Sequence, residues 1–139
     1  MTRKEKIVSH SFMLAKQIGL TLVDKEFNYG KGIGRADNYC IKSNWIVIIE
    51  LEFSQRHPEM NVLKVWPFLK NNQEKKIFFI HHITDTKQVS PNRIELSNFI
   101  SEKISENTDN RFEYFQILND FSEQKLLRLQ DKLKLKQIL

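Results

Sequence analysis

Two glutamates, Glu50 and Glu52, follow the most apolar stretch of the chain. Residues 45–53 read WIVIIELEF, and the β-branched, apolar first half of this segment is typical of a buried strand. Because side chains alternate along a strand, the two glutamates share one face with Ile46 and Ile48. Neighbouring carboxylates repel each other and lose hydration when they are buried, and a cation between them would offset both effects. A strand end that is simply exposed to water is the alternative explanation.

A third carboxylate, Asp37, belongs to the preceding segment. Residues 36–42 predict a second strand, and residues 43–44 predict a short turn that makes the two strands antiparallel. A turn centred there places Asp37 directly opposite Glu50, with Cβ atoms roughly 5 Å apart, whereas a three-residue loop would shift the register by one. With the centred turn, three carboxylates converge on one patch.

Convergent carboxylate oxygens suit a hard cation, Mg²⁺ or Mn²⁺. Such a cation lowers the pKa of a bound water and neutralises phosphate charge during an in-line attack. That chemistry fits hydrolysis of a phosphodiester bond. A calcium loop would instead carry alternating acids within one loop, a pattern that this sequence lacks.

Hydrophobic periodicity predicts the elements that position these acids. We expect helices at 3–18, 58–67 (bent or ended by Pro67), 91–106 and 122–139, strands at 20–29, 36–42, 45–53 and 75–83, and either a strand or a helix at 111–118. The helix after the third strand is long enough for a parallel crossover to the fourth. The sequence therefore predicts one α/β domain over residues 1–139, with a mixed central sheet, helices on both faces and a basic C-terminal helix at about 122–139.

The motif RAD at residues 35–37, followed after twelve residues by ELE at residues 50–52, resembles the PD-(D/E)XK, or restriction-endonuclease-like, superfamily. The predicted order of helix, three strands, helix and strand is that of the superfamily's common core (αβββαβ), and the resemblance covers residues 3 to about 83. It implies a Mg²⁺-dependent DNA endonuclease in which Asp37 and Glu50 bind the metal. Glu52 stands where the superfamily usually has lysine, although some of its restriction enzymes have glutamate there, and the motif's proline position holds alanine. A glutamate at that position would ligate a metal or accept the proton of water, whereas a lysine would stabilise phosphorane charge.

Five further residues are candidates for this site. Lys64 lies on the helix after the third strand and is expected to reach back and supply the missing lysine, with a solvated helix lysine as the alternative. Gln55 and Arg56 follow the strand, where a substrate phosphate could meet them, or form an ordinary exposed loop. His81 and His82 come near the site if the fourth strand is parallel to the third, and one of the two must face the core or a helix.

The net charge of the chain and the helix predicted at 122–139 indicate what kind of partner the protein binds. The net charge of +5 and the pI of about 9.3 fit a polyanion such as DNA. One stripe of residues 122–139 carries the basic residues Lys125, Arg128, Lys132 and Lys136, and Leu126, Leu129 and Leu133 lie beside it. The basic stripe is either a DNA track or a solvated face, and the leucines either pack on the domain or form a homodimer. A catalytically inactive nucleic-acid-binding module, or a protein-interaction domain that uses this helix, is the competing function.

Cysteine and apolar content indicate the compartment. The single cysteine, Cys40, excludes an intrachain disulfide and a zinc-type Cys/His spacing, so a reducing cytoplasm is the simplest expectation. The basic N-terminal segment is too broken by polar residues for a signal peptide. No window approaches the roughly 18 apolar residues of a membrane span, so no membrane association is expected.

Overall fold

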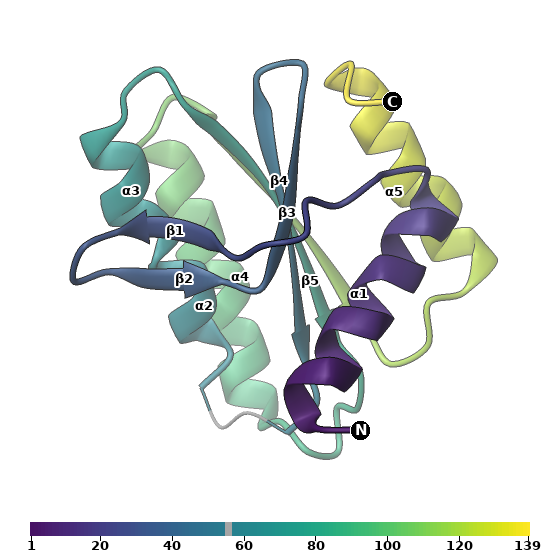
Figure 1. Cartoon of the computed structure of the whole chain (residues 1–139). Coiled ribbons are helices and arrows are strands. Elements are labelled where there is room, and N and C mark those ends of the chain that lie inside the picture. Colours follow the sequence, from purple (N-terminus) through teal and green to yellow (C-terminus); the bar gives the residue numbers. More distant parts are fainter. Residues whose placement is uncertain (55–56) are drawn as a thin grey trace.

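The computed structural model describes residues 1–54 and 57–139, and a four-stranded mixed sheet in the order β3-β4-β5-β6 forms its centre (Figure 1). The elements are α1 (Arg3–Ile18), β1 (Phe27–Gly30), β2 (Gly34–Ala36), β3 (Asn38–Lys42), β4 (Trp45–Glu52), α2 (Glu59–Leu63), α3 (Val65–Asn71), β5 (Lys76–Ile83), α4 (Pro91–Glu106), β6 (Phe112–Leu118) and α5 (Glu123–Leu135). β3 runs antiparallel to β4, whereas β4, β5 and β6 are parallel. The predicted α/β fold with a mixed sheet is therefore confirmed.

Helices cover both faces of this sheet. Figure 1 shows α1 and α5 on one side and α2, α3 and α4 on the other. Every residue of β4 is buried, as expected for a strand covered on both faces. Val47 and Ile49 belong to the apolar cluster that includes α1 and α5, whereas Ile46 and Ile48 belong to the cluster that includes α3. This alternation directs the two glutamates of β4 toward the side of α2, α3 and α4.

The turn between β3 and β4 sets the register of the site. Both residues at 43–44 have positive φ, the conformation of a two-residue type I′ hairpin. The pairing predicted from the sequence is present along the whole ladder, whose last pair is Asn38 with Ile49. One further step along both chains brings Asp37 level with Glu50, so the expected register is confirmed.

The strands before β3 differ from the prediction. In place of one strand at 20–29, only Val23 bridges to Tyr39 of the main sheet, and the chain then forms the separate β1–β2 hairpin. The strand predicted at 36–42 is split, because β2 ends one residue before Asp37 and β3 begins one residue after it. Glycines with positive φ at the hairpin turn let the chain reverse before it joins the main sheet.

Two open points of the sequence are settled by the fold. The segment at 111–118 is strand β6, parallel to β5. The helix expected to bend or end at Pro67 breaks three residues earlier, at Lys64, where α2 gives way to α3. Proline has no N–H and its ring crowds the carbonyl four residues before it, here that of Leu63, so the break falls in the turn that precedes Pro67.

The C-terminal helix packs on the domain. Leu129 and Leu133 of α5 are fully buried in the α1/α5 cluster. Two residues of the predicted basic stripe have partners within the chain, because Lys125 donates to two backbone carbonyls and Lys136 lies 3.1 Å from Glu113. Across residues 1–54 and 57–139, no helix is long and apolar enough to cross a membrane.

Candidate active site

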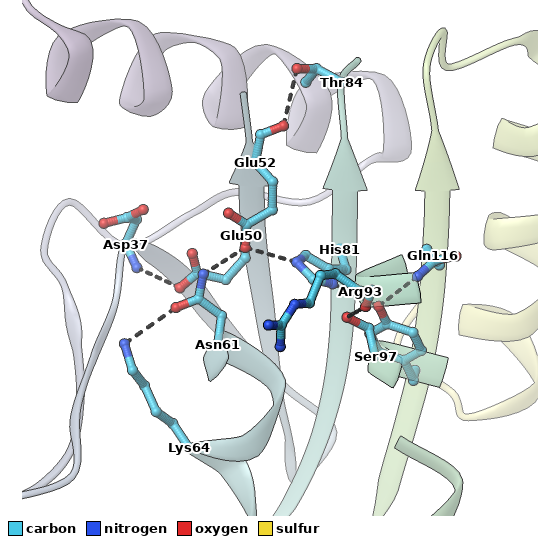
Figure 2. Close-up of polar contacts among 11 residues, drawn as sticks. Asp37, Glu50, Glu52, Asn61, Lys64, His81, Thr84, Arg93, Ser97 and Gln116 are labelled. Carbon is cyan, nitrogen blue, oxygen red and sulfur yellow. Dashed lines mark hydrogen bonds and ion pairs between the residues drawn. The ribbon is translucent and has the colours of Figure 1, made fainter. Parts of the chain in front are cut away.

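Asp37, Glu50 and Glu52 lie near one another at the C-terminal end of β4 (Figure 2). The backbone N–H of Asp37 donates to Glu50 Oε1 at 3.2 Å, which ties the start of β3 to the end of β4. Glu50 is 5% exposed and Glu52 is 0% exposed. The two glutamates are therefore buried acids, and the alternative of a solvated strand end is wrong.

The three carboxylates are not arranged around a common point. Figure 2 shows the Asp37 side chain turned away from the carboxylate of Glu50. Within the described residues, no group of three or more histidine, cysteine, aspartate or glutamate side chains is arranged to hold a metal ion. Shared coordination would require rotation of the Asp37 side chain, which is only partly buried.

Burial and like charge both act against ionisation of these acids. Burial raises the pKa of Glu50 well above its ordinary value, and the negative charges of Asp37 and Glu52 raise it further. The pKa of Asp37 is also raised, first by burial and then by Glu26 and Glu52. Lys64 lowers the pKa of both Asp37 and Glu50. A bound cation would act in the same direction as Lys64, by favouring the charged forms.

Glu52 is the most enclosed of the three acids. Its Oε1 accepts from Asn61 Nδ2 at 2.5 Å and lies 2.9 Å from His81 Nε2. Its backbone carbonyl accepts from both the N–H and the hydroxyl of Thr84. Its Oε2 is buried and has no hydrogen-bond partner in the described part of the chain. A buried carboxylate oxygen without a partner is costly, so Oε2 is a free ligand atom that fits a cation.

Lys64 reaches the site from the break between α2 and α3. Its Nζ donates to Asn61 Oδ1 at 3.2 Å, and Asn61 Nδ2 in turn donates to Glu52 Oε1. Asn61 therefore links Lys64 to Glu52. The aliphatic part of the side chain passes Gly34 of β2, where an added Cβ would lie 3.3 Å from Lys64 Cε. Gly34 also has a φ of 127°, which only glycine adopts readily. The β1–β2 hairpin therefore leaves room for the lysine.

The two histidines of β5 face opposite sides of the sheet. His81 is fully buried on the side of the acids, where its Nε2 meets Glu52 and its Nδ1 lies 2.6 Å from the Tyr114 hydroxyl. His82 points to the other side, where its Nε2 lies 2.5 Å from the backbone oxygen of Asn119. Burial lowers the pKa of His82. His81 therefore belongs to the site, and His82 is the one that faces the core, in line with the prediction that one of them must.

A partly exposed cation next to the site is Arg93 of α4. Its NH1 lies 2.8 Å from Oε1 of Glu59, a buried acid at the start of α2, while the arginine side chain is 41% exposed. An arginine with one buried partner and one open side is well suited to bind a phosphate oxygen. The sequence predicted that role for Gln55 and Arg56, which lie outside the described residues.

Besides Arg93, three further polar residues of the site were missed by the sequence reasoning. Asn61 lies three residues before Lys64, a spacing that places both on one side of a helical segment, and this signal could have found it. Tyr114 and Gln116 belong to β6, which the sequence left open between strand and helix, so no sequence signal pointed to them. Gln116 Nε2 donates to the Tyr114 hydroxyl at 3.1 Å.

Comparisons of the chain with protein-family models, with curated proteins and with solved structures gave no match. The relation to the PD-(D/E)XK superfamily is thus a resemblance of motif and element order. Function has to be argued from the geometry of the site itself.

Proposed function

We propose that this protein is a metal-dependent endonuclease that hydrolyses phosphodiester bonds of DNA. The observation that carries the proposal is the pair of buried glutamates at the end of β4, with Asp37 beside them and a free oxygen on Glu52. Burying two adjacent acids is unfavourable unless a positive charge joins them. Such an arrangement is more typical of a working site than of a structural core.

The residues present fit a hard divalent cation, Mg²⁺ or Mn²⁺. Asp37, Glu50 and Glu52 would hold it, since all three offer carboxylate oxygens, the ligands that such ions prefer. When bound, this cation supplies activation of a water and neutralisation of phosphate charge. The raised pKa values of Asp37 and Glu50 describe the cost of leaving these acids without such a partner.

The chain's own side chains provide the remaining functions. The Lys64 ammonium favours the ionised forms of Asp37 and Glu50, which are the forms able to bind metal. Glu52, in the position where a lysine is usual, serves as a ligand or accepts a proton from water. Arg93 offers an exposed guanidinium to the phosphate backbone. The net charge of +5 favours approach to DNA.

The test is cleavage of plasmid DNA with Mg²⁺ or Mn²⁺, with EDTA as the control. Asp37→Asn and Glu50→Gln should each lower the rate on the order of 100-fold or more, the scale seen when one group that stabilises a transition state is lost. Glu95→Gln, which removes an exposed carboxylate from α4, should leave the rate unchanged. Full cleavage by both site variants would refute the proposal.

A second outcome would redirect the proposal. Salt-sensitive DNA binding by the wild type, with no cleavage in either metal, would indicate the catalytically inactive binding module instead. Light scattering on the same samples checks whether the protein acts as a homodimer.

A further inference from the structure

We infer that Tyr114 and His81 are positioning residues, which hold Glu52 with Oε1 occupied and keep Oε2 free for a cation. The inference rests on the proposed function, since the cation is that of the nuclease site. It adds Tyr114, which the sequence did not identify, and gives His81 a defined role. Both act through Glu52.

The first argument is the direction of hydrogen-bond donation along a row of three side chains, Gln116, Tyr114 and His81. Gln116 Oε1 accepts from Asn98 Nδ2 at 3.3 Å, which turns the Gln116 amide nitrogen toward the Tyr114 oxygen, 3.1 Å away. An amide nitrogen only donates, so the Tyr114 oxygen accepts.

The Ser97 hydroxyl also bonds Tyr114, and its effect on the Tyr114 pKa is that of a second donor to the phenol oxygen. We therefore assign the Tyr114 proton to His81 Nδ1, 2.6 Å away. That leaves the His81 proton on Nε2, which faces Glu52 Oε1 at 2.9 Å. The row therefore ends with a donor directed at Glu52.

A second row reaches the same oxygen from the other side (Figure 2). The orientation of an asparagine amide is normally ambiguous. Here it is fixed, because the Lys64 ammonium can only donate and lies 3.2 Å from Asn61 Oδ1. The amide nitrogen of Asn61 must then face Glu52 Oε1, 2.5 Å away. Two donors thus converge on Oε1, while Oε2 has none in the described part of the chain.

The third argument is rigidity. Glu52, His81 and Tyr114 come from three adjacent parallel strands, β4, β5 and β6. Glu52 and His81 are both 0% exposed. Side chains fixed by a continuous sheet cannot follow a loop motion. Residues that orient a ligating carboxylate in this way typically change metal affinity by about 10- to 100-fold when they are removed.

The experiment measures binding of Mn²⁺ alone to the full chain, without DNA. Tyr114→Phe removes one oxygen from the row, and Tyr39→Phe removes the same atom from β3, outside the row. Tyr114→Phe should weaken Mn²⁺ binding by about tenfold or more, whereas Tyr39→Phe should bind as the wild type does. If Tyr114→Phe does not fold, Gln116→Met is the second variant. It removes the amide that donates to Tyr114, and it should also weaken Mn²⁺ binding.

A second readout does not depend on metal. Nitrogen-15 NMR of the metal-free wild type should show the His81 proton on Nε2. A wild-type proton on Nδ1, or equal Mn²⁺ affinity in Tyr114→Phe and Tyr39→Phe, would overturn the inference while leaving the proposed function standing. A wild type that binds no Mn²⁺ would overturn the proposed function and, with it, the role of Oε2.

Discussion

Glu50→Gln should make the protein more stable near neutral pH when no divalent cation is present. Glu50 is 5% exposed, and burial together with the charges of Asp37 and Glu52 raises its pKa. Glutamine has the same shape and keeps an oxygen that accepts the N–H of Asp37. The substitution therefore removes a charge and its repulsion while it preserves the hydrogen bond.

The expected magnitude follows from the geometry of β4. Glu50 and Glu52 are two residues apart, and a rise of about 3.3 Å per residue separates them by roughly 6.6 Å. Two unit charges at that distance repel by about 2.5 kcal/mol at an effective dielectric constant near 20. Relaxation of the surrounding side chains reduces this repulsion, so we expect a gain of roughly 1–2.5 kcal/mol near pH 8. For a chain of 139 residues, that corresponds to about 3–8 °C in the unfolding midpoint.

Thermal unfolding in EDTA across pH checks the sign. Because the pKa of Glu50 is raised in the folded state, that state keeps a proton which the unfolded chain releases above about pH 4.3. The stability from this proton is fully present below that pH and is lost as the pH rises through the folded pKa. The advantage of Glu50→Gln should therefore be small near pH 4.5 and grow toward pH 8. Adding Mn²⁺ should stabilise the wild type more than the variant, because the wild type keeps the full ligand set.

A control and a refuting result complete this test. Glu95→Gln, at an exposed position of α4, should change the free energy of unfolding by less than about 0.5 kcal/mol. A Glu50→Gln protein that is less stable than the wild type in EDTA near pH 8 would show that charge repulsion does not dominate at this position.

Three further predictions concern the rest of the molecule. Lys64→Met should lower the free energy of unfolding by about 1 kcal/mol near pH 8 in EDTA, and by less near pH 5. The reason is that the Lys64 ammonium offsets the charges of Asp37 and Glu50. An equal loss at both pH values would contradict this. Burial raises the pKa of the Cys40 thiol to about 11, so a thiol reagent near pH 8 should label the native protein far more slowly than the urea-unfolded chain, and equal rates would show that the thiol is accessible. Leu129→Ala, at a fully buried position of α5, should cost about 2–5 kcal/mol in urea unfolding, and a loss below about 0.5 kcal/mol would mean that α5 does not pack on the sheet as described.

Local patterns were enough to predict β4 and its antiparallel pairing with β3. Alternation along residues 45–52 assigned Glu50 and Glu52 to one face, because side chains on a strand alternate whatever the rest of the fold does. The two-residue turn at 43–44 fixed the register and so brought Asp37 beside Glu50. Both inferences depend on neighbours along the chain, which is why the sequence alone could support them.

The segment before β3 shows where local reasoning ended. The weak alternation of Leu20, Leu22 and Phe27 predicted one strand over 20–29. The chain instead pairs with the main sheet only at Val23 and then turns into a hairpin. Which partner a short strand finds depends on competition among edges of the assembled sheet, and hydrophobic alternation carries no information on that competition.

The sequence by itself determined that Asp37 lies level with Glu50 and that Glu50 and Glu52 share one face of a buried strand; only the tertiary structure decided how Glu52 is held. His81 lies 29 positions from Glu52 in the chain, and Tyr114 lies 33 positions from His81. Their contacts exist because β4, β5 and β6 lie side by side in one register. The order of strands in a sheet is a property of the whole fold. That order therefore also decides which carboxylate oxygen of Glu52 accepts hydrogen bonds and which has no partner among the described residues.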